Sequence, residues 1–252
     1  MHLFDVTGKK AVVTGASRGL GRGMAEGLLE SGAEVVLLAT NPKLAEIAED
    51  YGKKGFHCHA LIADIGGRAE REAAFEKALS LLGGRIDILV NAAGIQRRHF
   101  SEDFPLEDWD QVIAINQTAV FHLCQLAGKK MIAQGHGKII NISSMLAWFG
   151  GYTVPAYAAS KGAVSQLTKA LANEWASKGI NVNAIAPGYM ATEMNSALVA
   201  DAGRNAEISA RIPAHRWGTQ DDMKGPVIFL ASAASDYLNG AVIPVDGGYL
   251  NR

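Results

Sequence analysis

The sequence predicts one α/β domain in which helices cover both faces of a doubly wound parallel sheet of about seven strands. Short apolar runs alternate with amphipathic segments over nearly the whole chain, and no linker separates them. A glycine-rich turn follows the first apolar run directly, and polar residues follow most of the others. Because 252 residues fit one large α/β domain and show no repeat or low-complexity segment, we expect a single domain over residues 1–252.

Each apolar run has the length of a strand that is buried on both faces of a parallel sheet. We expect these strands at residues 9–14, 34–39, 56–64, 85–90, 137–142, 180–185 and 242–245. Amphipathic spacing predicts helices between them, at residues 21–31, 42–52, 68–82, 105–133, 157–178 and 220–231. Pro105 suits the first turn of the long helix, and Asn116 weakens its middle because the side chain competes for backbone hydrogen bonds. Residues 189–217 are less regular.

The glycine-rich turn contains Gly15, Gly19 and Gly21 in the spacing G-x-x-x-G-x-G. A strand, a glycine turn, a helix and a second strand make up the dinucleotide-binding unit of Rossmann-type folds. The glycines let the backbone approach a pyrophosphate, and the N-terminus of the helix offers unpaired N–H groups and the positive end of its dipole. The turn therefore predicts nucleotide binding.

Candidate functional residues follow five of the predicted strands, namely Gly15, Asp64, Asn91, Ser144 and Pro187. In an open parallel sheet the ligand lies beyond the carboxyl ends of the strands. Residues with purely structural roles would be scattered over both ends of the sheet. The shared placement therefore predicts a ligand site at the carboxyl edge.

Tyr157 and Lys161 are one helical turn apart, so on a helix they lie on the same face. A tyrosine phenol has an unperturbed pKa of about 10, and a neighbouring ammonium lowers that pKa because it favours the phenolate. Ser144 precedes them in the chain and supplies a hydroxyl that can hydrogen-bond a substrate oxygen. These side chains predict proton transfer to or from an alcohol or carbonyl oxygen.

Composition excludes several classes of protein. The formal net charge of −1 argues against general nucleic-acid or membrane-surface binding, which needs a basic excess. Cys58 and Cys124 lie far apart in the chain, which indicates reduced thiols and a cytoplasmic location. We find no signal segment and no apolar run of about 18 residues, so we expect no membrane span. In a strand, His57 and His59 would point away from Cys58, so we expect no metal site there.

Six motifs together resemble the short-chain dehydrogenase/reductase family over essentially the whole chain. They are Thr14-Gly15-x-x-x-Gly19-x-Gly21, Asn91-Ala92-Ala93-Gly94, Asn116, Ser144, Tyr157-x-x-x-Lys161 and Pro187-Gly188. The resemblance implies an oxidoreductase with Asn116, Ser144, Tyr157 and Lys161 as its catalytic tetrad. Tyr157 would be the general acid/base and Ser144 would polarise the substrate oxygen. Lys161 would lower the pKa of Tyr157 and hold the nicotinamide ribose, and Asn116 would hold a water through its main chain.

The resemblance also implies a nicotinamide cofactor. Its contacts would be Gly15, Ser17, Arg18, Gly19, Leu20 and Gly21 at the pyrophosphate, Thr40 and Asn41 after the second strand, Asp64 and Ile65 at the adenine, Asn91, Ala92 and Gly94 at the ribose, Tyr157, Lys161, and Pro187, Gly188, Met190 and Thr192 toward the carboxamide. No acidic residue follows the second strand, where NAD-specific members usually have one, and Arg18 and Lys43 could meet a 2′-phosphate. These residues favour NADP, whereas the close family members are mostly NAD-linked. We therefore expect both NAD and NADP to be used.

Within the family, several segments resemble dehydrogenases of sugar acids, among them Ile95-Gln96-Arg97-Arg98 and Arg211-Ile212-Pro213-Ala214. This implies a substrate such as 2-dehydro-3-deoxy-D-gluconate or 2-deoxy-D-gluconate. Gluconate 5-dehydrogenases, 3-ketoacyl-type reductases and a non-catalytic nucleotide-binding scaffold remain alternatives. Residues 189–217 would cover the substrate, and the family implies a homotetramer that uses the helix of Tyr157 and the strand near Val242.

A sugar acid brings a carboxylate, which needs a cationic or N–H partner when it is buried. Arginine suits it because the planar guanidinium donates two parallel hydrogen bonds. The expected carboxylate ligands are Arg98 first, Arg216 second and Arg97. Ser144, Met145, Tyr152, Tyr157, Tyr189 and Trp217 would line the rest of the substrate site.

Overall fold

The computed structural model describes residues 3–251, and over this range seven parallel strands form one central sheet. The order across the sheet is β3-β2-β1-β4-β5-β6-β7. The strands are β1 (Lys10–Thr14), β2 (Glu34–Ala39), β3 (Cys58–Ile62), β4 (Ile88–Asn91), β5 (Gly137–Ile142), β6 (Ile180–Pro187) and β7 (Val242–Val245). The predicted doubly wound parallel sheet is confirmed.

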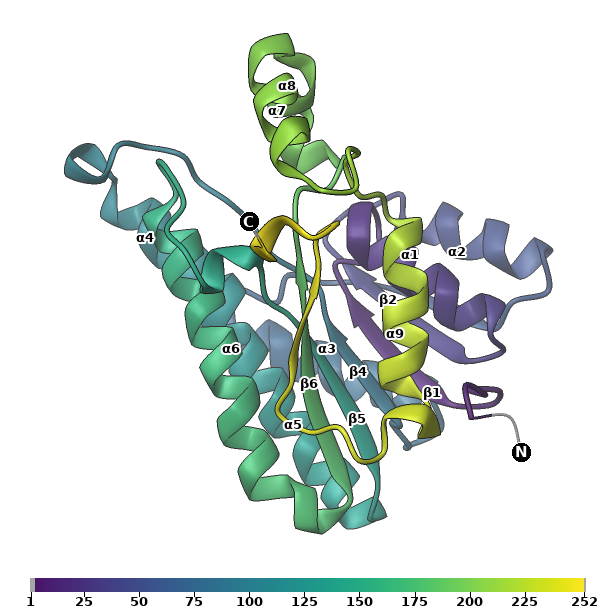
Figure 1. Ribbon diagram of the computed structural model, residues 1–252. Coiled ribbons are helices and arrows are strands. Elements are labelled where there is room, and N and C mark those ends of the chain that lie inside the picture. Colours follow the sequence, from purple (N-terminus) through teal and green to yellow (C-terminus); the bar gives the residue numbers. More distant parts are fainter. Residues whose placement is uncertain (1–2, 252) are drawn as a thin grey trace.

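Helices cover both faces of the sheet (Figure 1). One face carries α1 (Gly19–Glu30), α2 (Leu44–Lys53) and α9 (Lys224–Ala231), and the other carries α3 (Arg68–Leu81), α5 (Ala119–Gln134) and α6 (Pro155–Trp175). Side chains alternate between the two cores along a strand, so that Val13 belongs to the first core and Val12 to the second. The near-continuous apolar strands follow from this burial on both faces.

The strand order reverses between β1 and β4, so a crevice opens at their carboxyl ends. Gly15 follows β1 with a φ of +68°, which disfavours other residues. A Cβ on Gly15 would lie 2.8 Å from the Cα of Ala93. The hydroxyl of Thr14 accepts hydrogen bonds from the amides of Ala92 and Ala93, both at 3.0 Å. The glycine turn and the segment after β4 are therefore locked together.

The predicted continuous helix over residues 105–133 is wrong in one respect. The structure has α4 (Leu106–Ile113), a π-helical turn at Ala114–Thr118 and then α5. Asn116 lies in the π turn, where its side chain is fully buried. Its amide group bonds the backbone of Ile95 in both directions, and π turns of this kind are frequent at functional sites.

Residues 189–217, expected to be irregular, contain two short helices, α7 (Ser196–Ala200) and α8 (Ala202–Arg211). These helices stand above the carboxyl edge of the sheet (Figure 1). Asp201 caps α8 by accepting a hydrogen bond from the amide of Arg204 at 3.0 Å. The apolar pattern missed α8 because few of its residues are buried, Ile208 being one.

No helix within residues 3–251 has both the length and the apolar character needed to cross a membrane.

Candidate functional site

Tyr157, Lys161 and Ser144 come together at the carboxyl end of β5. Lys161 is buried on α6, and its Nζ lies 5.5 Å from the centre of the Tyr157 ring. The same Nζ donates a hydrogen bond of 2.6 Å to the carbonyl of Ile142, the last residue of β5. Ser144 is buried just beyond this strand. The structure thus brings together the three side chains that the sequence predicts for proton transfer.

Burial dominates the electrostatics of this group. Burial raises the pKa of Tyr157, and interaction with the Ser144 hydroxyl lowers it in part. Burial also lowers the pKa of Lys161 to about 8. Desolvation of the phenol therefore dominates the pKa of Tyr157 in this structure, while the ammonium of Lys161 is bound to the Ile142 carbonyl. The effect of Lys161 on the pKa of Tyr157 stays a prediction.

Asn116 joins the π turn to the helix that carries Tyr157. Its Oδ1 accepts from the amide of Ile95 at 2.9 Å, and its Nδ2 donates to the carbonyl of Ile95 and to the hydroxyl of Ser160. Ser160 donates in turn to the carbonyl of Tyr157 at 2.7 Å. Ser160 is not among the residues predicted from the sequence, because nothing in the local pattern links it to Asn116.

Gly94 lies where the predicted cofactor residues meet the catalytic ones. A Cβ on Gly94 would be 3.3 Å from Oδ1 of Asn116 and 3.8 Å from Nζ of Lys161. Nearby, Asn91 donates to Asn141 and Cys124, while its buried Oδ1 has no partner within the described residues. The end of β4 is therefore contiguous with the site on α6.

The glycine turn has the features of an anion site. Helix α1 begins without a side-chain cap and without an acidic residue in its first turn, so its N-terminal N–H groups are available. Gly19 has a φ of +55°, and a Cβ there would find nothing closer than the Thr192 methyl at 3.7 Å. By contrast, a Cβ on Gly21 would lie 2.3 Å from the carbonyl oxygen of Gly15. Open space in front of free N–H groups fits a pyrophosphate.

The other predicted cofactor residues surround this turn. Arg18 is exposed and forms an ion pair with Glu193, so Arg18 and Thr192 link the turn to the segment after β6. Thr40 is exposed, and Asn41 accepts from the amide of Lys43 at 3.0 Å. Ser17 and Leu20 of the turn are partly buried. After β3, Asp64 accepts a hydrogen bond from the amide of Gly66, and the carbonyl of Ile65 accepts one from Arg71. After β6, Pro187 is buried, Gly188 lies against Asp246 and Met190 lies against Gly218.

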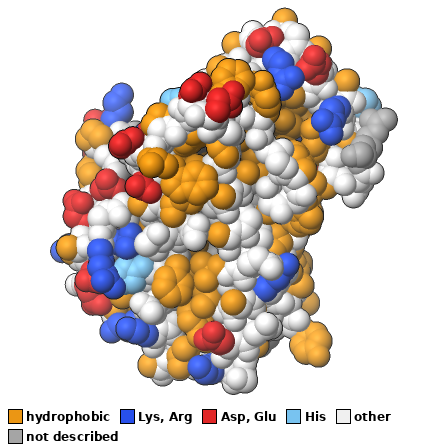
Figure 2. Space-filling view, turned by 90° about the vertical axis from the view of Figure 1, so that its left-hand side faces the viewer, with side chains coloured by type: hydrophobic (Ala, Val, Ile, Leu, Met, Phe, Trp, Pro, Cys, Tyr) orange, Lys and Arg blue, Asp and Glu red, His pale blue; other side chains and the backbone are white. Residues whose placement is uncertain are grey.

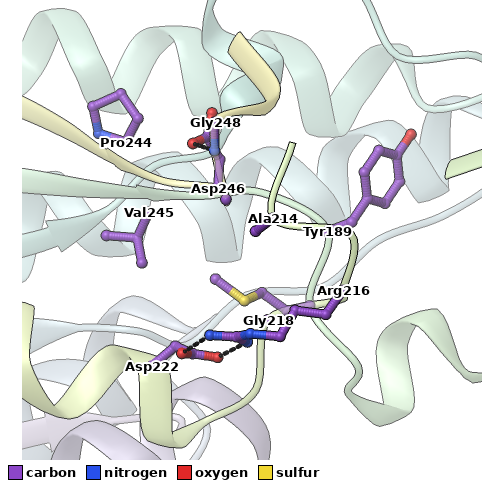
Figure 3. Close-up of a pocket in the computed structure, with 11 residues that line it drawn as sticks. Tyr189, Ala214, Arg216, Gly218, Asp222, Pro244, Val245, Asp246 and Gly248 are labelled. Atoms are coloured by element: carbon purple, nitrogen blue, oxygen red, sulfur yellow. Dashed lines mark hydrogen bonds and ion pairs between the residues drawn. The ribbon is translucent and has the colours of Figure 1, made fainter. Parts of the chain in front are cut away.

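Two of the three predicted carboxylate ligands already have carboxylate partners. Arg216 binds Asp222 with two hydrogen bonds of 2.7 Å, and this pairing holds the pKa of Asp222 well below its usual range (Figure 3). Arg97 donates to Asp108 at 3.3 Å and also to Gln111. Arg98 is exposed and donates only to the side chain of Gln96, at 3.3 Å. Arg97 and Arg216 would therefore have to give up a carboxylate partner to receive a substrate.

Figure 3 shows a hollow between the end of β7 and the start of α9. The Arg216–Asp222 pair lies on one side of it and Tyr189 points away from that pair. Its lining includes Tyr189, Met190, Ala214, Arg216, Asp222 and Asp246. Neither Ser144 nor Tyr157 contributes to this lining, so the hollow does not contain the group predicted for proton transfer.

An aromatic cluster forms one wall near Ser144. The ring of Tyr189 packs against Trp217 and Tyr249, with centroids 5.4 and 5.3 Å apart, and Phe149 lies 5.9 Å from Tyr249. Met145, which follows Ser144, is buried in the same cluster. The sequence predicted Met145, Tyr189 and Trp217 here but not Phe149 and Tyr249. The glycine pair directly before Tyr249 was a signal, because it indicates a fixed turn at that point of the chain.

Tyr152, also predicted to line the substrate site, is not brought to this cluster. Its side chain is 78% exposed and packs edge-on against Phe100, with ring centroids 6.0 Å apart.

Comparison with known proteins places these features in context. The model of the short chain dehydrogenase family matches residues 9–203. The chain is 49% identical over 255 residues to 2-dehydro-3-deoxy-D-gluconate 5-dehydrogenase of Dickeya dadantii, covering 100% of this chain and 99% of that protein. It is 47% identical over 250 residues to the Bacillus subtilis protein of the same name, covering 99% and 97%. The crystal structure of a gluconate 5-dehydrogenase from Burkholderia cenocepacia, in complex with NADP and tartrate, matches with a TM-score of 0.95 and 43% identity, covering 99% and 98%.

Proposed function

The chain belongs to the short-chain dehydrogenase family, and we propose that it transfers a hydride reversibly between a nicotinamide cofactor and a small sugar acid. The reacting group would be a secondary alcohol or ketone. The observation that carries this proposal is the convergence of Ser144, Tyr157 and Lys161 beside Gly94 at the carboxyl end of the sheet. A non-catalytic scaffold would have no need for a buried lysine without a carboxylate partner.

In the proposed reaction, the bound nicotinamide supplies or accepts the hydride at the substrate carbon. Tyr157 gives a proton to the substrate oxygen during reduction and takes it back during oxidation, and the raised pKa of its phenol keeps that proton available. Ser144 hydrogen-bonds the same oxygen. The positive charge of Lys161 stabilises the phenolate that forms transiently. The side chain of Asn116 is occupied by hydrogen bonds to Ile95 and Ser160. A water of the proton relay would therefore be held by the main chain of Asn116.

The cofactor proposal is supported by the open glycine turn and the uncapped start of α1. We infer that Gly15, Ser17, Arg18, Gly19, Leu20 and Gly21 hold the pyrophosphate, with the predicted residues after β2, β3, β4 and β6 along the rest of the molecule. No carboxylate directly follows β2, and Arg18, in the glycine turn, and Lys43, just after β2, are both exposed. These features favour use of NADP as well as NAD, and the Burkholderia cenocepacia relative binds NADP.

Residues 189–217 would form the segment that covers the substrate. Its first part contacts the glycine turn through Thr192 and Glu193, and its last part packs against Tyr249 through Ile208 and Ile212. A segment anchored at both ends and raised above the sheet suits the closure of a site over its substrate.

The substrate class is supported by relatives whose names specify derivatives of gluconate. 2-Dehydro-3-deoxy-D-gluconate and 2-deoxy-D-gluconate are the first choices, and gluconate at its C5 hydroxyl is the alternative. A 3-ketoacyl-type reductase is less favoured, because the relatives named above act on derivatives of gluconate and a cation, Arg211, lies over the Tyr249 ring.

The test is a panel of substrates followed by absorbance of the reduced nicotinamide. It contains the two deoxy-sugar acids, gluconate, 5-keto-D-gluconate, a neutral polyol and an acetoacetyl thioester. We expect kcat/KM to be highest for one of the sugar acids. Preference for the thioester would replace the proposal by the ketoacyl reductase, and absence of turnover with every compound would support the scaffold.

We also propose a homotetramer. Helix α6 presents small residues on its outer face, among them Ala159, Ala163 and Ala170, and a Cβ on Gly162 would meet nothing within 4 Å. Figure 2 views this side of the molecule, where hydrophobic side chains gather along the middle. On α5, the side chain of Phe121 is 44% exposed. A face of small side chains allows a helix of a second copy of the chain to approach α6 closely. The cytoplasmic location predicted from the cysteines stays a prediction.

A further inference from the structure

Arg211, at the end of α8, has an environment that differs from that of the other arginines near the site. Its guanidinium carbon lies 4.7 Å from the centre of the Tyr249 ring. Its side chain has no hydrogen bond or ion pair with any described residue, whereas Asp108, Glu207 and Asp222 neutralise the neighbouring Arg97, Arg204 and Arg216. Arg211 is therefore a cation that is oriented by an aromatic face and still free to bind an anion.

The position of Arg211 follows from the packing beneath it. Ile208 and Ile212, on either side of Arg211 in sequence, are buried in one cluster with Tyr249 and Met145. Met145 directly follows Ser144, which interacts with Tyr157. A continuous set of contacts thus leads from the proposed proton donor to the platform on which Arg211 rests.

The end of the chain fixes this platform. Gly247 and Gly248 both have positive φ values, and added Cβ atoms would lie 2.8 Å from Ile212 and 3.1 Å from Pro213. The amide of Ala214 donates to the carbonyl of Gly247 at 3.0 Å. The last turn of the chain and the base of the covering segment are therefore held as one unit, so that Tyr249 keeps its place under Arg211.

We propose that Arg211, stacked on Tyr249, binds the carboxylate of the substrate and thereby selects sugar acids over neutral alcohols. This inference rests on the proposed function. It assigns to Arg211 the role that the sequence gave to Arg98, which likewise has no carboxylate partner among the described residues, and to Arg216, which is paired with Asp222. The guanidinium fork can donate two parallel hydrogen bonds to the carboxylate. Stacking limits the rotamers of the fork in advance, so less entropy is lost on binding.

Tyr249 and Tyr189 supply the remaining donors. Burial, with the neighbouring Tyr189, raises the pKa of Tyr249, so the phenol keeps its proton and can donate to an anion. The carboxylate and the reacting carbon of a sugar acid are several bonds apart. A cation that rests on the cluster of Met145 and Tyr249, and not on Tyr157 itself, suits this separation.

The experiment compares Arg211→Met with the unaltered enzyme on the best sugar acid of the panel and on the neutral amide of that acid. We expect KM for the acid to rise about 10- to 100-fold, as for loss of a hydrogen bond to a charged group, with little change in kcat. Activity on the amide should not change. Arg204→Met is the matched control, since Arg204 lies on the same helix but is held by Glu207 at 2.6 Å. Affinity for the reduced nicotinamide, followed by its fluorescence, should be the same in all three proteins.

The outcomes separate the two proposals. If the unaltered enzyme uses acid and amide equally well, the sugar-acid function and the role of Arg211 both fall. If it prefers the acid and Arg211→Met retains that preference, only the Arg211 assignment is overturned. An equal rise in KM with Arg204→Met would show that the overall charge of the segment, and not a specific contact of Arg211, causes the effect, which would overturn the assignment. A rise with Arg98→Met in its place would restore Arg98 to the role.

Discussion

Lys161 donates a 2.6 Å hydrogen bond to the main-chain carbonyl of Ile142. This contact ties the ammonium of a helix residue to the final carbonyl of β5, in a position that is almost entirely removed from water. No carboxylate within residues 3–251 forms an ion pair with Lys161, so its charge is carried at the cost of desolvation. The orientation of the proposed proton-transfer group is thus set by the end of a strand and not by an opposite charge.

Tyr157→Phe removes the hydroxyl that would deliver the proton and leaves the ring in place. We expect kcat to fall by about 10²- to 10⁴-fold, the usual contribution of general acid–base catalysis. Titration of reduced nicotinamide fluorescence should show nearly unchanged cofactor affinity. A variant that keeps most of its kcat would refute the assignment of Tyr157.

Lys161→Met tests the desolvation of the ammonium through the pH dependence of stability. The pKa of Lys161 is lowered from 10.5 to about 8 in the folded protein, so the unfolded chain binds more protons between these values. The folded protein therefore carries the full penalty below pH 8 and loses it as the pH rises toward 10.5. We expect the variant to be more stable than the parent at pH 7 by up to about 3 kcal/mol.

Urea unfolding at pH values from about 7 to 9.5 measures this difference, and the advantage of Lys161→Met should shrink as the pH rises. The range stops below the raised pKa of Tyr157, whose ionisation would act in the opposite direction. A difference that is constant over the range would mean that Lys161 is not a desolvated ammonium. Activity of the variant should be lost throughout.

Arg18 gives a test of cofactor selection. We expect kcat/KM for NAD and NADP to differ by less than about 10⁴-fold in the parent enzyme, since such a ratio needs a demanding polar site. Arg18→Ala should lower kcat/KM for NADP by about tenfold, the loss of one charge-assisted hydrogen bond to an exposed phosphate, and leave NAD nearly unaffected.

Glu193→Gln is the companion variant, because it releases Arg18 from its ion pair without altering the glycine turn. It should leave NADP use equal or improved. Equal losses with both cofactors in Arg18→Ala would show that Arg18 shapes the turn and does not select the 2′-phosphate.

The proposed homotetramer can be tested at α6. Ala170→Arg places a long charged side chain on the exposed small-residue face and should reduce the mass measured by light scattering at micromolar concentration. Ala45→Arg is the matched control, because Ala45 is an exposed alanine of α2, on the opposite face of the sheet. A monomeric parent protein, or equal dissociation by both variants, would contradict the interface.

The glycine turn and the strand ends could be predicted from the sequence because their signals are local. Apolar runs and the spacing of Gly15, Gly19 and Gly21 depend on neighbouring residues, and a parallel sheet brings the ends of its strands to one edge whatever the details of packing. Tyr157 and Lys161 could be paired for the same reason, since a helix places them on one face. The sequence thus determined the fold, and it predicted the cofactor edge and the group proposed for proton transfer.

Only the tertiary structure decided which of the candidate arginines are paired with carboxylates. Arg216 is neutralised by Asp222 and Arg97 by Asp108, whereas Arg211 meets a tyrosine that comes from the last turn of the chain. It also decided that burial raises the pKa of Tyr157, and that Asn116 lies in a π turn held by Ile95. The physical reason is that charge pairing and desolvation depend on groups that folding brings from distant parts of the chain, and no local pattern records them.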